Sequence, residues 1–305
     1  MKVESTKPLS FRLWQSKFLY LLILPTITYF IIFAYVPFYG IIIAFKDLQI
    51  YRGIWDSPWV GLKHFETFFH SPQFKLLLSN TLLISIYRIL FGFPVPILFA
   101  LLLNEVRAMW FKRFVQTVTY FPHFLSWVIF GGIIFNFLGP VGILNLLFKD
   151  MGMEPVNFLT STDLFRPIVI VTGILKEFGW GAIIYLAALS GIDPQLYEAA
   201  KIDGASKLRQ IWHVTLPGIR STIALMLILS LAGIMDAGFE QIFILSNPVV
   251  YEVGDIIDTY VYRTGLLEAN FGMATAVGLF KGVIGAILIV TANAAIRKTG
   301  ERSIW

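Results

Sequence analysis

Six apolar stretches dominate this sequence, and each is long enough to cross a lipid bilayer as a helix. A membrane-spanning helix needs about 20 mostly apolar residues. Six segments meet this requirement, at residues 18–45, 74–103, 114–138, 167–190, 216–245 and 273–296. Backbone polar groups in lipid must be satisfied within the segment, so each stretch is expected to be helical. The sequence therefore predicts an all-α, polytopic membrane protein in which residues 1–305 form a single transmembrane domain.

Composition agrees with this prediction and narrows the chemistry. Hydrophobic residues make up 57% of the chain and charged residues only 14%, which is too little charge for the surface of a soluble protein of this length. Cysteine is absent, which excludes disulfides, cysteine-ligated zinc and thiol catalysis. The four histidines lack metal-ligand spacing, and no serine has an evident base partner. We therefore do not expect an enzyme, or a cofactor bound by this chain.

The distribution of basic residues predicts the orientation. If the N-terminus is cytoplasmic, the inner segments contain 14 of the 24 Lys and Arg residues and the outer segments contain 7. The positive-inside rule then places both termini in the cytoplasm. These basic residues are scattered at the ends of the spans rather than clustered on one face. The net charge of +5 therefore reflects membrane topology rather than nucleic-acid binding.

The inner loop at residues 191–217 has the signals of two short helices joined by a tight turn. Asp193 followed by Pro194 is typical of a helix start, because the aspartate can cap the helix and proline suits its first turn. Asp203-Gly204 predicts a break, with Asp203 capping a second helix over 205–213. Pro217 is expected to open the fifth span. Small and apolar side chains in this loop favour a docking element for a cytoplasmic partner, although an amphipathic loop lying among lipid headgroups has a similar pattern.

The spacing of residues in this loop resembles a known family. Glu198-Ala-Ala, three residues, Gly204, nine residues and then Val214-Thr-Leu216-Pro217 is similar to the EAA loop of ABC importer permeases, with Val214 where that family has an isoleucine-type residue. The similarity extends to the carbohydrate-uptake branch of maltose-type and polysaccharide permeases, which includes the first membrane subunit of alginate-oligosaccharide importers. It is carried by Leu24-Pro25, residues 35–37 and 185–189, and residues 236–243, 247–252, 255–262 and 275–281.

This resemblance implies one half of an ATP-driven import pathway in a bacterial inner membrane. A second permease, two ABC ATPase subunits and an extracytoplasmic solute-binding protein would complete the assembly, and the substrate would be a saccharide such as an acidic polysaccharide fragment. No Gly-x-x-x-x-Gly-Lys-Ser/Thr sequence occurs, so ATP and Mg²⁺ would be bound by the partner ATPase. The expected coupling residues are Glu198, Ala199, Ala200, Asp203, Gly204, Leu216 and Pro217.

Six charged residues lie within the predicted spans: Arg88, Lys176, Glu177, Asp236, Glu240 and Lys281. A charge at membrane depth costs at least about 2.5–3.5 kcal/mol, so such groups usually pair with one another or face a cavity. One hypothesis is internal pairing of three cations with three acids, with Asp236 and Glu240 sharing a helix face. The other places these charges in a saccharide pathway, where a cation would favour a uronate.

Aromatic and amide residues complete the candidate pathway. Trp180 and Tyr185 could offer ring faces to a sugar, and Phe239, Gln241 and Asn136 are further candidates. A secondary transporter driven by an ion gradient would also explain charges within the spans. However, the sequence has no inverted repeat, and a structured inner loop fits such a transporter poorly.

Overall fold

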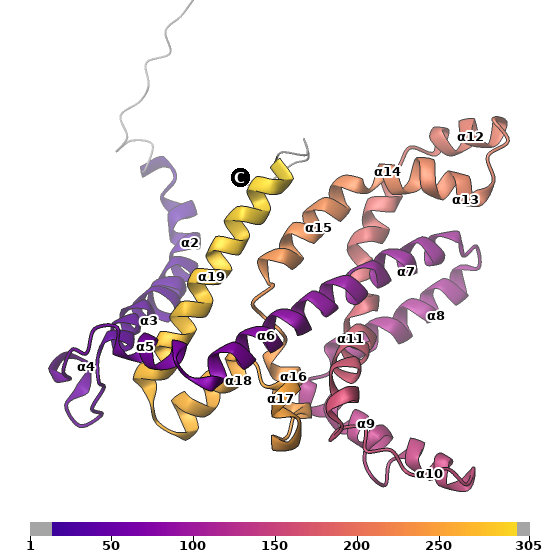
Figure 1. Ribbon diagram of the computed structural model, residues 1–305. Helices are drawn as coiled ribbons and strands as arrows, with labels where there is room; N and C mark the ends of the chain where they lie inside the picture. Colours follow the sequence, from indigo (N-terminus) through magenta and orange to yellow (C-terminus); the bar gives the residue numbers. More distant parts are fainter. Residues whose placement is uncertain (1–13, 298–305) are drawn as a thin grey trace, which may run out of the picture.

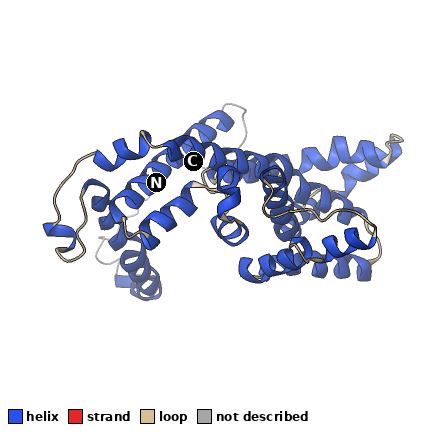
Figure 2. Cartoon of the chain, turned by 60° about the horizontal axis from the view of Figure 1, so that its bottom comes forward, coloured by secondary structure: helices blue, strands red, loops and turns tan. Residues whose placement is uncertain are grey.

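A computed structural model describes residues 14–297, and within these residues it contains helices and no strand beyond one isolated bridge between Lys46 and Trp59 (Figure 2). Five helices in this part of the chain are long and apolar enough to cross a membrane, and a sixth span results if one bent helix pair is counted. The predicted fold class is therefore confirmed. The expectations that rest on the basic residues of the two chain ends fall partly outside the described residues.

The first two spans agree with the sequence prediction. Residues 17–45 form one nearly continuous helix, and residues 72–105 form the next. The first consists of α2 (Lys17–Phe30), η1 (Ile31–Tyr35), α3 (Val36–Phe38) and η2 (Tyr39–Phe45), and the second of α6 (Pro72–Tyr87), η3 (Arg88–Gly92) and α7 (Pro94–Glu105). No residue in the most apolar part of the first span is buried against the rest of this chain. Its side chains are therefore left for lipid or another subunit to cover.

Proline explains where three of these helices change their winding. The segments η1, η3 and η5 (Ile211–Thr215) are π-helical turns, and each ends two residues before a proline, at Pro37, Pro94 and Pro217. A proline cannot donate a backbone hydrogen bond, and its ring collides with the carbonyl four residues earlier. A wider π turn moves that carbonyl aside, so the helix continues past the proline instead of ending.

The third span differs from the prediction of 114–138. Helix α8 (Met109–Tyr120) ends at a 3₁₀ turn, η4 (Phe121–Phe124), which contains Pro122. A new helix, α9 (Trp127–Leu138), then starts at Ser126, whose hydroxyl accepts the Ile129 amide hydrogen bond at 3.3 Å. The apolar run that can span a membrane continues through α10 (Ile143–Asp150) and covers 127–150. The predicted segment therefore contains a break that apolarity alone did not reveal.

The fourth span is continuous, whereas the predicted fifth span of 216–245 is interrupted twice. Helix α11 (Thr162–Ser190) contains the fourth. The fifth begins with a 63° bend between residues 207–218 and α15 (Arg220–Ala232), and the chain leaves the helix again before α16 (Phe239–Leu245). Glycines at 233 and 238 flank this second break. The loop between the fourth and fifth spans contains α12 (Pro194–Ile202), α13 (Lys207–Gln210) and α14 (Leu216–Gly218).

The remaining elements lie mainly at the opposite end of the molecule from α12. Figure 1 places α12, α13, the start of α2 and the end of α19 at one end, with α4, α10 and α17 at the other. The bounds are α4 (Gly53–Asp56), α5 (Lys63–Phe69), η6 (Pro248–Val250), α17 (Tyr251–Gly254), α18 (Ile257–Tyr262), η7 (Arg263–Leu267) and α19 (Phe271–Arg297).

Helix α11 is the centre of the packing. Its N-terminal half is buried in one apolar cluster through Phe165 and Val169, together with Ile242 of α16. Its C-terminal half belongs to a second cluster through Ala182 and Tyr185, packed against α7 and Ile219. Between these two clusters the side chains of α11 are more polar. That interval is where the cavity described below is found.

Candidate functional site

The loop at 191–217 folds into the two-helix hairpin that the sequence predicts. Asp193 Oδ1 accepts the Gln195 amide hydrogen bond at 2.9 Å and caps α12. At the other end of α12 the Ala205 amide donates to the Ala200 carbonyl at 2.8 Å, and the Gly204 amide to the Lys201 carbonyl at 3.0 Å. These two bonds form a Schellman motif. Gly204 has φ +74°, a conformation that glycine adopts without strain.

Three details of this loop differ from the prediction. Ser206, not Asp203, caps α13, because its hydroxyl accepts the Arg209 amide hydrogen bond while Asp203 occupies the C-terminal cap of α12. The second helix continues through η5 to 218 rather than ending at 213. Pro217 therefore lies in the last turn before the 63° bend and does not open the fifth span.

Side-chain contacts fix the hairpin to itself and to α7. The Tyr197 hydroxyl lies 3.0 Å from the Thr215 hydroxyl, which joins α12 to η5. Lys207 Nζ donates to Glu105 Oε2 at 2.7 Å at the end of α7. Glu198 and Ala199 point outward and are exposed. Leu208 and Trp212 are 66% and 63% exposed, so the hairpin presents apolar side chains with no cover within this chain.

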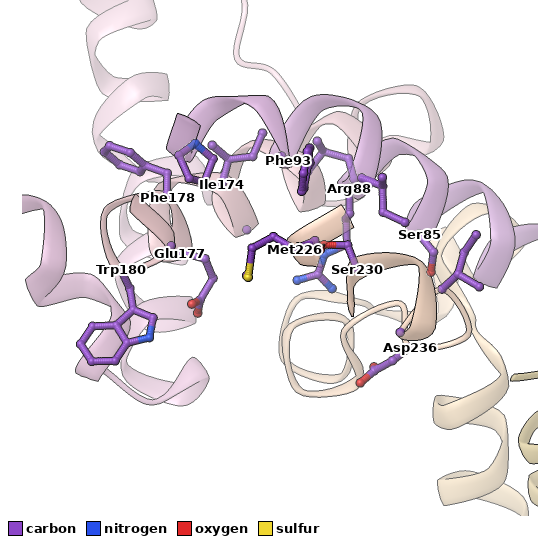
Figure 3. Close-up of a pocket in the computed structure, with 18 of the residues that line it drawn as sticks. Ser85, Arg88, Phe93, Ile174, Glu177, Phe178, Trp180, Met226, Ser230 and Asp236 are labelled. Atoms are coloured by element: carbon purple, nitrogen blue, oxygen red, sulfur yellow. The ribbon is translucent and has the colours of Figure 1, made fainter. Parts of the chain in front are cut away.

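A cavity of about 330 Å³ lies between α6–α7, α11 and the end of α15, and it brings together five of the eight predicted pathway residues. These five are Arg88, Glu177, Trp180, Tyr185 and Asp236. In Figure 3 the Arg88 guanidinium extends into the cavity, with the Glu177 and Asp236 carboxylates on different sides of it. Ser85, Ser230 and Met226 also line the wall. The arrangement is that of a mostly apolar pocket with a few converging polar groups.

Arg88 is held from one side only. It starts the π turn η3, and its Nη1 donates to the Ala237 carbonyl at 2.7 Å. Among the described residues, no carboxylate oxygen lies within the 4.0 Å of an ion pair with it. Gly238 makes room for the guanidinium: a Cβ there would lie 1.8 Å from Nη1, and the backbone has φ +88°. The backbone conformation favours glycine at this position, and any Cβ would force the Arg88 guanidinium to move from where it lies.

The negative charge of Glu177, by contrast, is balanced by a neighbour that the sequence did not reveal. His123 Nδ1 donates to Glu177 Oε2 at 2.7 Å, and the His123 ring stacks on Trp180 at 4.5 Å with an interplanar angle of 3°. The turn η4 brings His123 to this place, so the Pro122 break and the Ser126 cap were the signals available in the sequence.

Lys176 stabilises this junction and does not line the cavity. Its side chain is only 5% exposed, and Nζ donates to the carbonyls of Pro122 and His123 at 3.3 and 2.8 Å and lies 3.5 Å from Glu177. Its ammonium group therefore stabilises the packing of η4 against α11.

The other predicted pathway residues are placed differently from the expectation. Asp236 and Glu240 do not share a helix face, because Asp236 lies in the break before α16 and accepts the Gly238 amide hydrogen bond at 3.1 Å. Glu240 is exposed in the first turn of α16 and does not line the cavity. Lys281 pairs at 2.5 Å with Asp258 of α18, which lies between the predicted fifth and sixth spans. Gln241 is buried and bonds to Val169 and Thr172.

Neither hypothesis for the six charges is therefore complete by itself. Lys176 with Glu177, and Lys281 with the unexpected partner Asp258, are ion pairs. Arg88 and Asp236 instead face the cavity. No group of three or more His, Asp or Glu side chains among the described residues could hold a metal ion.

Comparisons with known proteins agree with this architecture. Residues 92–300 match the family model described as "Binding-protein-dependent transport system inner membrane component". The polygalacturonan/rhamnogalacturonan transport system permease protein YteP of Bacillus subtilis strain 168 is 50% identical over all of this chain and 95% of its own length.

Solved structures give the same result. The crystal structure of a bacterial ABC transporter involved in import of the acidic polysaccharide alginate contains a chain that is 42% identical, with TM-score 0.89 over 96% of this chain and 99% of that one. A second structure, of a bacterial alginate ABC transporter with an alginate pentasaccharide-bound periplasmic protein, matches with TM-score 0.90 and 41% identity over 98% of this chain and all of that chain. The EAA-type loop, the helical architecture and these matches agree: the chain belongs to the family of inner membrane components of binding-protein-dependent transport systems, the permeases of ABC importers.

Proposed function

We propose that this chain forms one half of the pathway by which an ABC importer takes up an acidic oligosaccharide. The observation that carries the proposal is the Arg88 guanidinium, which enters the cavity with one hydrogen bond to a carbonyl and no carboxylate partner among the described residues. An arginine offers five N–H donors in a planar fork that matches a carboxylate. A uronate carboxylate would complete this coordination.

The rest of the cavity suits the sugar ring. Trp180 provides aromatic surface, Asp236 and Ser230 provide acceptors and a hydroxyl, and Tyr185 lines the wall but is only 2% exposed. Glu177 contributes little uncompensated charge, because His123 and Lys176 both contact it. Similar proteins transport polygalacturonan/rhamnogalacturonan and the acidic polysaccharide alginate, which supports an acidic saccharide as the substrate of this chain.

Membership of this family supports the remaining assembly that we propose. The exposed hairpin at 194–218 would dock in a cleft of one of two ATPase subunits, which bind ATP and Mg²⁺, so that this chain itself performs no catalysis. Glu198, Ala199, Ala200 and Gly204 would face that cleft, with Asp203, Leu216 and Pro217 supporting the geometry. A second permease would complete the pore, and a solute-binding protein would deliver substrate from outside, with both termini of this chain in the cytoplasm.

The experiment is uptake by the reconstituted complex, with binding protein loaded with either an acidic or a neutral oligosaccharide. We expect Arg88→Gln to lower uptake of the acidic substrate by about tenfold, as expected for the loss of about 1.4 kcal/mol. Uptake of a neutral substrate, if the complex accepts one, should fall less.

Arg88→Lys keeps the charge without the fork and is expected to give an intermediate value. Normal uptake of the acidic substrate by Arg88→Gln would remove the central support for the proposal. If the complex moved solute without any ATPase in contact with residues 193–217, the conclusion that transport is driven by ATP would be wrong.

A further inference from the structure

A second hollow adjoins the cavity, and Asp236 lines both of them. This outer groove has a volume of about 810 Å³ and is bounded by η2 of the first span, α18 and α19. Its wall on α19 extends from Phe271, at the end away from α12, to Gly282. At 1.5 Å per residue this is a length of about 16 Å, so the groove reaches from the outer end of the span toward mid-membrane. Figure 3 shows Asp236 at the margin of the cavity, away from Glu177 and Trp180.

The groove contains charge at a depth where lipid would penalise it. Lys281 Nζ and Asp258 Oδ1 pair at 2.5 Å, and both side chains remain nearly a quarter exposed in the groove wall. The second oxygen of Asp258 is buried and has no hydrogen-bond partner among the described residues. Ionisable groups within a span usually face a water-filled cavity or a polar ligand. The rest of the groove wall is mostly apolar, so this ion pair and Asp236 are the main polar groups that an occupant would meet there.

Aromatic rings also line the groove. Phe239 and Tyr262 line it, and both contact Phe243, with centroid distances of 5.5 and 4.8 Å. The combination of ring faces with a Lys–Asp pair and Asp236 repeats the chemistry of the first cavity, where Trp180 and Tyr185 accompany Arg88 and Asp236. Two adjoining hollows of similar chemistry suggest one elongated ligand.

The volumes support the same conclusion. Small-molecule pockets measure about 300–1,000 Å³, so a cavity of about 330 Å³ lies at the low end of this range. It cannot enclose an oligosaccharide of several units. The groove adds more than twice that space on the other side of Asp236.

We propose that the outer groove is a second saccharide subsite, which holds the sugar units of a longer oligosaccharide that extend beyond Asp236. This inference rests on the proposed function, because it assigns the first units to the Arg88 cavity. The permease itself would then discriminate between oligosaccharides by their length. The short substrate needs the cavity alone, and the long substrate needs both hollows.

Gly278 offers a way to fill the groove without disturbing its walls. It lines the groove, lies inside α19, and a Cβ built there meets no heavy atom within 4 Å. Gly285 also has open space at its Cβ but lies two turns further along α19 and does not line the groove. Gly278→Trp and Gly285→Trp are therefore a matched pair, because both add the same bulk to the same helix.

The test compares uptake of a uronate disaccharide and a uronate pentasaccharide by the reconstituted complex. We expect Gly278→Trp to lower the ratio of pentasaccharide to disaccharide uptake by about tenfold, which corresponds to about 1.4 kcal/mol. Gly285→Trp should leave the ratio unchanged. Tyr262→Ala, which removes a ring without adding bulk, is also expected to lower this ratio. It provides the test if the tryptophan variant does not assemble.

Two results would overturn the subsite. Equal loss of both substrates in Gly278→Trp and Tyr262→Ala would make the groove a packing surface or a passage. Unchanged uptake of both would mean that lipid or a helix of the second permease fills it. Neither result affects the proposed function, which fails separately if Arg88→Gln transports the acidic disaccharide normally.

Discussion

The hairpin at 194–218 keeps its shape through contacts between near neighbours in sequence, whereas the cavity is assembled from distant residues. In the hairpin, Asp193 caps the amide two positions on, and even the bond between Tyr197 and Thr215 joins residues only 18 positions apart. In the cavity, Arg88 reaches a carbonyl 149 positions away.

The two regions can therefore have different tasks in transport. The turns and caps of the hairpin are set by local hydrogen bonds, so it can keep its shape when it moves against a partner, although Ile211 and Leu216 also pack against α7 and α11. A cavity made of several helices changes shape whenever those helices move. Such a division is what a permease needs if force enters at one end and substrate passes at the other.

We expect the largest loss of uptake from a substitution that disrupts the long-range contact between Arg88 and residues 237–238. In Gly238→Ala the new methyl group would overlap the Arg88 guanidinium, and a non-glycine residue at φ +88° adds about 1–2 kcal/mol of strain. We expect uptake to fall by more than about tenfold and the melting temperature of the complex to fall as well.

Gly152→Ala is the matched control for that experiment. Gly152 also has positive φ, +75°, but its Cβ would meet nothing within 4 Å. It should show the backbone strain without the loss of transport. If the two variants behaved alike, the contact between Gly238 and Arg88 would not matter for the cavity.

The local character of the hairpin explains why most of it could be predicted from sequence. The Asp193-Pro194 start and the Gly204 turn are signals that act within a few residues, and the structure contains both. The same reasoning assigned the second cap to Asp203, whereas the structure uses Ser206, three residues further along the chain.

The cavity could be predicted only in part. Charge at membrane depth identified Arg88 and Asp236 as unusual, and both line it. His123 and Asp258 were missed because their importance arises from partners 54 and 23 positions away. The breaks in the third and fifth spans were missed because apolarity continues through them, while proline and glycine end the helices there.

A second test concerns the turn in the hairpin. Gly204→Val puts a β-branched residue at φ +74°, where such residues are rarely found, whereas Gly204→Asn keeps the conformation accessible. Open space surrounds the Cβ position, so neither variant clashes within this chain. We expect Val to lower uptake by about tenfold, by about 1.4 kcal/mol, at an unchanged level of assembled complex. The number of ATP molecules consumed per transported substrate should rise.

Asn at the same position should transport at nearly the normal rate. If Val and Asn could not be distinguished in coupled uptake and ATPase assays, the turn would have no part in coupling.

A smaller effect tests which residue caps α13. Ser206→Ala removes the cap and should cost about 0.5–2 kcal/mol, seen as faster hydrogen exchange of the amides at 207–210. Asp203→Ala should leave that exchange unchanged, because Asp203 caps nothing at this helix. If Asp203→Ala accelerated the exchange and Ser206→Ala did not, Asp203 would be the cap, as the sequence predicted.

The smallest effect is expected at the ion pair between Lys207 and Glu105. Both side chains are well exposed, and exposed pairs contribute about 0.2–1 kcal/mol. Lys207→Ala should therefore change the melting temperature of the complex little, and any change should disappear at high salt. A large, salt-independent loss of uptake would instead show that the hairpin depends on α7 and is not an independent unit.

The most direct test of the pathway uses the absence of cysteine from this chain. Ser230 lines the cavity and is partly exposed, so Ser230→Cys introduces one thiol at the proposed site. In the assembled importer, supplied with ATP and loaded binding protein, we expect an acidic oligosaccharide to slow the labelling of this thiol by a water-soluble reagent. A cysteine at Ser190, outside the cavity, should label at a constant rate. If saccharide left the labelling of residue 230 unchanged under every condition that supports uptake, the substrate would take another route and the account would be wrong.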